Sequence, residues 1–153
     1  MKTKSFLYSL MVLATLLGAA TQAQANGRSP FHGTAQGMIT SVTPVALGLS
    51  IQVESQGEAT RLGRFTRTEV LVLDPATNTF AGLIAFKAAN GDTLTGIVSG
   101  GFVSPTTATG TYVFTGGTGR FANAGGWAAF SLTTEDGVNF SVSFKGAIDK
   151  APR

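Results

Sequence analysis

The chain has 153 residues, a formal net charge of +3 and no cysteine. The lack of cysteine excludes disulfides, thiol catalysis and thiolate metal sites, so stability has to come from packing and backbone pairing. The single histidine, His32, excludes a histidine triad and a metal site with several histidines, and we expect it to lie on the surface of a mobile N-terminal arm.

The first 25 residues have the pattern of a secretory signal peptide. Lys2 and Lys4 precede an apolar run over 6–20, and the small-x-small sequence Ala23-Gln24-Ala25 follows it. A membrane anchor needs about 20 uninterrupted apolar residues, which this run does not provide. We therefore expect cleavage after Ala25, export to the periplasm or the medium, membrane contact only during export, and one domain over 26–153.

Charge argues against nucleic acid as a partner. Removing Lys2 and Lys4 from the eleven basic residues leaves nine against eight acidic residues. The densest basic group, Arg61, Arg64 and Arg67, is too small to form a broad phosphate-binding face.

Apolar residues recur with period two through the first half of the domain, which predicts strands rather than helices. A first strand ends at Pro44, polar residues 55–58 turn the chain after the second, and Asp74-Pro75 ends a long third. The predicted strands cover 34–43, 47–53 and 60–73.

The second half continues the pattern. Asn90-Gly91 is the strongest hairpin signal in the chain because both residues accept a positive φ, and Asp136-Gly137 makes the last turn. These strands cover 80–88, 93–102, 109–114, 127–134 and 138–148.

Eight short antiparallel strands predict an all-β, up-and-down barrel, whose closure removes exposed edges. Glycines inside several strands fit the sharp coiling that closure requires. A two-sheet sandwich is the alternative, and the barrel is preferred. An eight-stranded barrel is either filled by side chains or holds one small ligand, and that choice is the functional question.

The corner at 115–126 reads T-G-G-T-G-R-F-A-N-A-G-G, with Phe121 expected as a buried plug. It resembles the G-G-T-G-x-F-x-x-A-x-G signature of dirigent proteins and allene oxide cyclase-like barrels. Two upstream blocks, 59–66 and 88–92, are similar to a bacterial exported family with this barrel, although Arg61 replaces a histidine that is frequent there. The resemblance covers about 59–148 and implies a calycin-like barrel of this type.

What the resemblance implies about function is confinement without a cofactor. Dirigent proteins steer the coupling of phenoxy radicals without supplying the oxidant, and allene oxide cyclases close a reactive lipid epoxide inside an apolar barrel. Their acidic and tyrosine residues do not map onto this sequence. The plant relatives are trimeric, which implies a homo-oligomer in which part of an aromatic face packs against a neighbouring subunit.

No cofactor or metal site is expected. Gly117-x-Gly119-x-x-Ala122 formally matches a dinucleotide fingerprint, but the glycines that follow exclude the helix such a site needs. Asp74, Asp92 and Asp136 sit at turns, where capping of the backbone explains them.

Arg67 and Glu69 form the strongest polar cluster, two residues apart on one strand face. Inside the barrel they would be a candidate acid/base or ligand-orienting pair, and outside it a solvated contact. The solvated or purely structural interpretation is preferred. Tyr112 is a second candidate, either a core residue, which is preferred, or a hydroxyl that meets a ligand oxygen.

The remaining candidates are aromatic and aliphatic residues that share strand faces, interpreted either as solid core or as the lining of a cavity for an apolar molecule. Trp127 is expected to plug one end. The complete candidate cavity comprises Arg67, Glu69, Phe80, Ile84, Phe86, Tyr112, Phe114, Phe140 and Phe144.

Three hypotheses follow, and they leave open whether the protein is an enzyme. The first is an exported, cofactor-free barrel that binds an apolar small molecule or has a structural or interaction role. The second is a cofactor-independent cyclase, isomerase or dirigent-like protein that directs stereochemistry by confinement. The third is a surface or matrix protein with a solid interior. A cavity of about 300 Å³ or more with polar groups inside would favour the first two.

Overall fold

The computed structural model describes residues 27–149. The predicted signal peptide and its cleavage site lie outside the described residues. Within the described part, no helix is long and apolar enough to cross a membrane.

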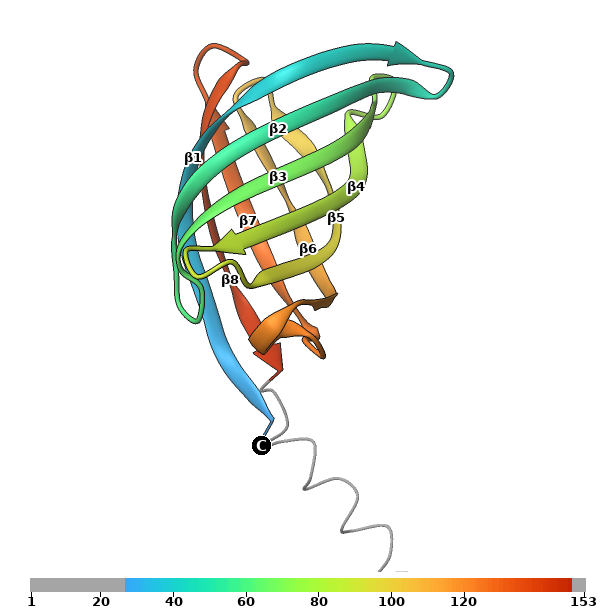
Figure 1. Ribbon diagram of the computed structural model, residues 1–153. Helices are drawn as coiled ribbons and strands as arrows, with labels where there is room; N and C mark the ends of the chain where they lie inside the picture. The colour runs from blue at the N-terminus through green and yellow to red at the C-terminus, as the bar shows by residue number, and fades with distance from the viewer. Residues whose placement is uncertain (1–26, 150–153) are drawn as a thin grey trace, which may run out of the picture.

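Eight antiparallel strands follow one another around a closed barrel, and β8 pairs with β1 to complete it (Figure 1). The predicted all-β barrel is confirmed, and the sandwich alternative is wrong. The strands are β1 (Arg28–Val45), β2 (Gly48–Ala59), β3 (Gly63–Asp74), β4 (Thr79–Ala88), β5 (Thr93–Ser104), β6 (Thr107–Gly117), β7 (Gly126–Thr134) and β8 (Asn139–Asp149).

Several predicted boundaries near the start of the domain are wrong. The polar residues 55–58 continue β2 instead of turning the chain, because Ser55 and Gly57 face inward while Gln56 and Glu58 face water. The turn comes at 60–62, where Arg61 has a φ of 70°. His32 lies in β1, exposed and opposite Lys145, and not in a mobile arm.

Glycines and phenylalanines pair across neighbouring strands on the inner face. There are four such pairs, and in each of them a Cβ added to the glycine would lie 2.7 to 3.0 Å from the Cζ of the phenylalanine ring opposite. Each glycine therefore leaves the space that an aromatic ring fills, which allows tight curvature without a void. The pairs are Gly33 with Phe144, Gly37 with Phe140, Gly100 with Phe80 and Gly110 with Phe130.

One half of the barrel is closed by packed aromatic rings and by the glycine corner. The corner forms a single 3₁₀ turn, η1 (Gly119–Phe121), which buries the Phe121 side chain as predicted. The three-residue turn provides no helix for a dinucleotide site. We call this the closed end. It also holds the turns at 60–62 and 89–92, the start of β1 and the end of β8 (Figure 1).

Trp127 does not plug the barrel. Its side chain lies on the outer wall and is 45% exposed, because the inward position of β7 belongs to its neighbour Ala128. Alternation places Trp127 and Ala128 on opposite faces of β7 but does not determine which of the two faces points inward.

Candidate functional site

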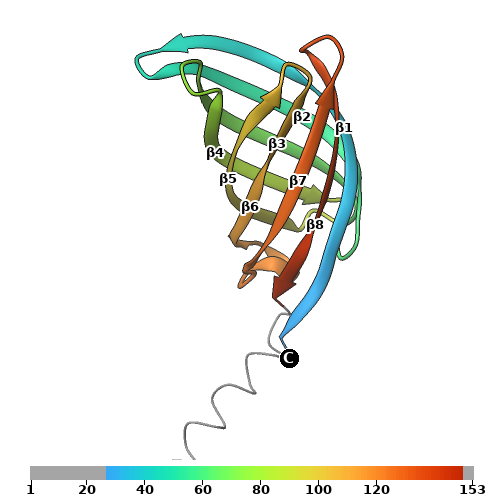
Figure 2. The same ribbon diagram turned by 180° about the vertical axis from the view of Figure 1, so that it is seen from behind.

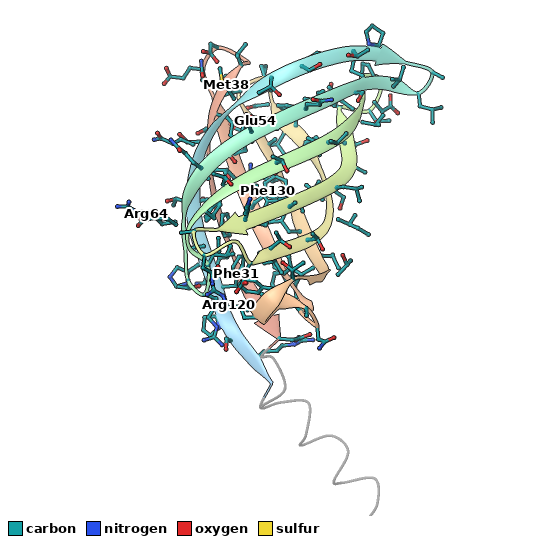
Figure 3. The ribbon with its side chains drawn as sticks, in the orientation of Figure 1. Phe31, Met38, Glu54, Arg64, Arg120 and Phe130 are labelled. Carbon is teal, nitrogen blue, oxygen red and sulfur yellow. The ribbon has the colours of Figure 1, made fainter. Side chains whose placement is uncertain are left out.

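A pocket of about 90 Å³ lies inside the barrel at the end opposite η1. Its mouth lies beside the β7–β8 turn and includes the partly exposed side chains of Phe102 and Val138. Tyr112 of β6 and Phe130 of β7 line the pocket, and their rings stack with centroids 4.6 Å apart. Figure 3 shows Phe130 inside the barrel and Arg64 projecting away from the barrel. Most of the wall is apolar, and its aliphatic part includes Ile51, Val53, Leu71, Leu73 and Leu132.

Three polar side chains meet at this pocket. Arg67 Nη1 donates a hydrogen bond of 2.8 Å to the Tyr112 hydroxyl oxygen, and Arg67 Nη2 lies 3.1 Å from Glu69 Oε1. The side chains of Arg67 and Glu69 are only 1% and 7% exposed, because alternate residues of β3 from Phe65 to Leu71 face inward. Of the preferred interpretation, the placement of this pair in solvent is therefore wrong, and a purely structural role stays a prediction.

The polar cluster is not satisfied by the protein itself. Arg67 Nε is buried without a hydrogen-bond partner, and so is Ser55 Oγ on the neighbouring strand. Glu69 Oε1 is in ion-pair contact with Arg67 Nη2 at 3.1 Å but makes no hydrogen bond of acceptable geometry. Aromatic faces compensate part of the guanidinium charge, since the Arg67 Cζ lies 5.8 Å from the ring centres of both Tyr112 and Phe140. A buried charge with unused hydrogen-bonding capacity is costly, and the sites where natural proteins tolerate it are frequently functional.

Burial also changes the proton affinity of the cluster. It raises the pKa of Glu69 above its ordinary value of 4.5, and the positive charge of Arg67 partly offsets this increase. Burial likewise raises the pKa of Tyr112, so its hydroxyl keeps its proton. Glu69 and Tyr112 therefore hold their protons more tightly than exposed side chains of the same kind, next to the positive charge of Arg67.

The raised pKa of Glu69 predicts a pH-dependent stability. The folded state binds this proton more tightly than the unfolded chain, so the stabilisation is complete below about pH 4.5 and is lost as the pH rises through the folded pKa. We expect the free energy of unfolding of the wild type, minus that of Glu69→Gln, to fall in urea titrations as the pH rises above about 4.5. A difference that does not change with pH would contradict this assignment. Asp136 does not interfere, because hydrogen bonds from Asn139 and Val138 lower its pKa to about 2.

Larger hollows lie on the outside of the barrel. Two of them, about 760 and 1110 Å³, extend over β1, β2, the start of β3, β7 and β8, and many of their lining residues are threonine, serine and other outward-facing side chains. These two hollows are open to solvent and include neither Arg67 nor Glu69. Because the interior pocket is lined by Arg67, Glu69 and Tyr112 together, we take it as the candidate site. Among residues 27–149, no group of three or more acidic or histidine side chains is placed to hold a metal ion.

Comparison with known proteins identifies the type of barrel. No protein-family model and no curated protein matches the sequence. The pterocarpan synthase dirigent protein GePTS1 matches in structure with a TM-score of 0.62 and 14% identity, over 82% of this chain and 89% of its own. The pterocarpan synthase dirigent protein PsPTS1 matches with a TM-score of 0.57 and 14% identity, over 84% and 98%. The chain folds as a dirigent-like barrel. At 14% identity these matches show the fold alone. It is the fold that the resemblance of the glycine corner implied.

The dirigent-like barrel divides the predicted cavity residues into two groups. All nine face the interior, but only five line the pocket: Arg67, Glu69, Phe80, Tyr112 and Phe140. The other four belong to the packed core and do not line the pocket: Ile84, Phe86, Phe114 and Phe144.

Sequence reasoning missed part of the site. Ser55 does not line the pocket but lies opposite Arg67 in the strand register, and its expected place in a turn did not predict this inward position. Phe130 and Leu132 share the even-numbered face of β7, and the alternation of that strand was a signal that could have identified them. Phe102 closes the predicted fifth strand, but nothing in the local sequence places it at the mouth of a pocket.

Proposed function

We propose that this dirigent-like barrel is exported and binds one small, largely apolar molecule with an oxygen-bearing group, without a cofactor, in the pocket at the end opposite η1. The observation that carries the proposal is the Arg67–Glu69–Tyr112 cluster, which is buried and incompletely hydrogen-bonded against an apolar pocket. Apolar walls favour an apolar ligand, and a few polar groups would orient it.

Stability alone does not account for this cluster. Replacing a buried ion pair by apolar residues of similar volume is frequently neutral or stabilising, by about 1 to 4 kcal/mol. A barrel that needed only a solid core would be served at least as well by leucine or methionine at 67 and 69. The charged pair therefore supports a role in recognition.

The size of the pocket limits the ligand. A cavity of about 90 Å³ is smaller than the ~150 Å³ engineered cavity that accommodates benzene, and smaller than the ~300 Å³ of a typical drug-sized site. It falls below the volume at which a ligand site was expected, yet it has the expected polar groups inside. A single ring or short chain would enter with modest side-chain movement, and the rest of the molecule would project past Phe102 and Val138.

A second candidate function is cyclisation or stereochemical control by confinement. It is favoured by the likeness to pterocarpan synthase dirigent proteins and by the proton-holding groups Glu69 and Tyr112 beside Arg67. A confined substrate would react through geometry and proton donation instead of a nucleophile. Turnover to a product enriched in one stereoisomer, lost in Glu69→Gln but with binding retained, would favour this candidate over simple binding.

Thermal shifts with small probes test the binding proposal. We expect phenol to raise the Tm more than benzene does, because its hydroxyl can reach the polar cluster. At a phenol concentration of about 100 times Kd, the linkage amounts to about 2.7 kcal/mol. Leu132→Trp fills the pocket and should abolish the shift, whereas Leu47→Trp, at the exposed tip of the β1–β2 hairpin, should preserve it.

The design separates the pocket from general effects on stability, because each shift is measured within one variant. A shift of equal size in Leu132→Trp and Leu47→Trp would place binding elsewhere on the protein. No shift with phenol, benzene or octanol would leave the pocket without a ligand of the proposed class and overturn the proposal.

A further inference from the structure

The buried polar cluster at the pocket has more hydrogen-bond donors than acceptors. A guanidinium carries five N–H donors and no acceptor. Arg67 uses Nη1 on the Tyr112 hydroxyl oxygen and holds Nη2 beside Glu69 Oε1, while its Nε has no partner. Within residues 27–149 the Tyr112 hydroxyl accepts this bond and donates to no other group. A ligand group that only accepts hydrogen bonds would therefore complement the cluster.

A carboxylate meets this requirement better than other oxygen groups do. It accepts at two oxygens, and its planar fork matches two N–H directions of a guanidinium. A hydroxyl or carbonyl oxygen would use fewer of the donors and would leave Glu69 as the only counter-charge of Arg67. The pocket walls are mostly apolar, so the rest of such a ligand would be a ring or a short chain.

A second negative charge in the pocket requires that Glu69 become neutral. Arg67 and Glu69 are buried and together carry no net charge. Two carboxylates that share one buried cation repel each other, which raises the pKa of one of them. Burial already raises the pKa of Glu69, so this carboxyl group is the one that takes the proton. Tyr112 is the only other titratable side chain besides Arg67 that faces the interior from the described strands, and its pKa is also raised by burial.

The mouth of the pocket carries negative charge. Glu135 and Asp136 are exposed in the turn between β7 and β8, which Figure 2 shows at the end of the barrel opposite η1. Gly137 and Val138 of the same turn line the pocket. Hydrogen bonds from Asn139 and from the backbone of the turn lower the pKa of Asp136 to about 2, so its charge persists at neutral pH. Such a mouth slows the approach of an anion but does not repel an uncharged acid.

We propose that the ligand of the pocket is a small carboxylic acid, whose carboxylate displaces Glu69 from Arg67 while Glu69 takes up a proton. This inference rests on the proposed function, because it names the chemical class of the ligand for the same pocket. The acid enters uncharged, and the O–H bond of its carboxyl group breaks. The proton forms a new O–H bond on the Glu69 carboxylate, and the electron pair stays on the ligand carboxylate, which pairs with Arg67. When the ligand is ionised in solution, the proton comes from water.

Isothermal titration calorimetry with benzoate and its neutral analogue benzamide tests the proposal, in a series from about pH 5 to about pH 9 in which benzoate is ionised. We expect the Kd of benzoate to rise about tenfold for each pH unit above the pKa of Glu69, and the Kd of benzamide to stay constant. In the same range, titrations in phosphate and in Tris should show that one proton is taken up for each benzoate bound and none for benzamide. A benzoate Kd that does not change with pH, or no proton uptake at any pH of the series, would overturn the proposal.

Two matched substitutions show which carboxyl group takes the proton. Glu69→Gln introduces a neutral side chain of the same shape, so benzoate should bind without proton uptake and with a Kd that no longer changes with pH. Glu135→Gln is the same substitution at an exposed glutamate beside the mouth, and it should keep the tenfold change per pH unit. If Glu69→Gln keeps that change as well, the proton is taken up elsewhere and the proposal is wrong.

Neutral probes separate this inference from the proposed function. If phenol and benzamide bind in the pocket but benzoate does not, the carboxylic acid is wrong and the proposed binding of an oxygen-bearing apolar molecule stands. If none of the three binds, both are wrong. The wild-type titrations decide between these outcomes without any substitution, so the test does not depend on the folding of Glu69→Gln.

Discussion

Arg67→Met is expected to lower the free energy of unfolding by about 3 kcal/mol. The substitution removes the hydrogen bond to the Tyr112 hydroxyl and the positive charge beside Glu69. Both the hydrogen bond and the ion pair are buried. Breaking a buried ion pair costs about 3 to 5 kcal/mol, and the lower end applies because Glu69 can become neutral by taking up a proton. Urea unfolding at neutral pH measures the loss.

The double variant Arg67→Met with Glu69→Leu decides what the pair does. It replaces both charges by apolar side chains of similar volume, so we expect it to recover most of the stability lost in Arg67→Met. The Tyr112 hydroxyl still lacks its partner, which limits the recovery by about 1 kcal/mol. The double variant should nevertheless lose the phenol-induced thermal shift. If it is far less stable than Arg67→Met, the pair serves the fold and the argument for a recognition role fails.

Phe86→Ala is expected to cost about 3 to 5 kcal/mol, as truncation of a fully buried aromatic ring does. Phe86 has no exposed surface. Its ring makes edge contacts with rings of five other residues: Phe31, Phe65, Tyr112, Phe114 and Phe144. Removal would leave a cavity in the packed half of the barrel. Chemical denaturation gives the change directly if unfolding is two-state.

Phe102→Ala is the matched control for this prediction. Phe102 is 37% exposed, and among the aromatic rings it pairs with Phe80 at the mouth of the pocket. We expect it to cost less than half as much as Phe86→Ala. Equal losses would mean that the two halves of the barrel are packed alike, which contradicts the division into a solid half and a half with a pocket.

Local sequence predicted the architecture well. Period-two alternation, the Asn90-Gly91 turn and the glycine corner are signals within a few residues of one another, and each led to the correct element. The corner also placed Phe121 in the interior. The same reasoning failed at 55–58, because the inward positions of this part of β2 are Ser55 and Gly57, so the strand has no apolar alternation to detect there.

The candidate site was predicted only as a set of alternatives. Alternation puts Arg67 and Glu69 on one face together with Phe65 and Leu71, but it does not say whether that face points inward. The energetic expectation that charges face water preferred the wrong side. Tyr112, on β6, reaches Arg67 on β3 only because the barrel closes, and no local pattern contains that contact. The volume of the pocket depends on how side chains from all the strands pack together, so it too lay beyond the sequence.

Native mass spectrometry of the protein purified from the cells that produce it tests the central claim most directly. We predict that each wild-type chain carries one small organic molecule. The double variant, Arg67→Met with Glu69→Leu, should fold and carry none. A wild type free of any bound molecule, which also fails to take up phenol, benzene or octanol, would contradict the claim that the pocket beside Arg67 and Glu69 is a binding site.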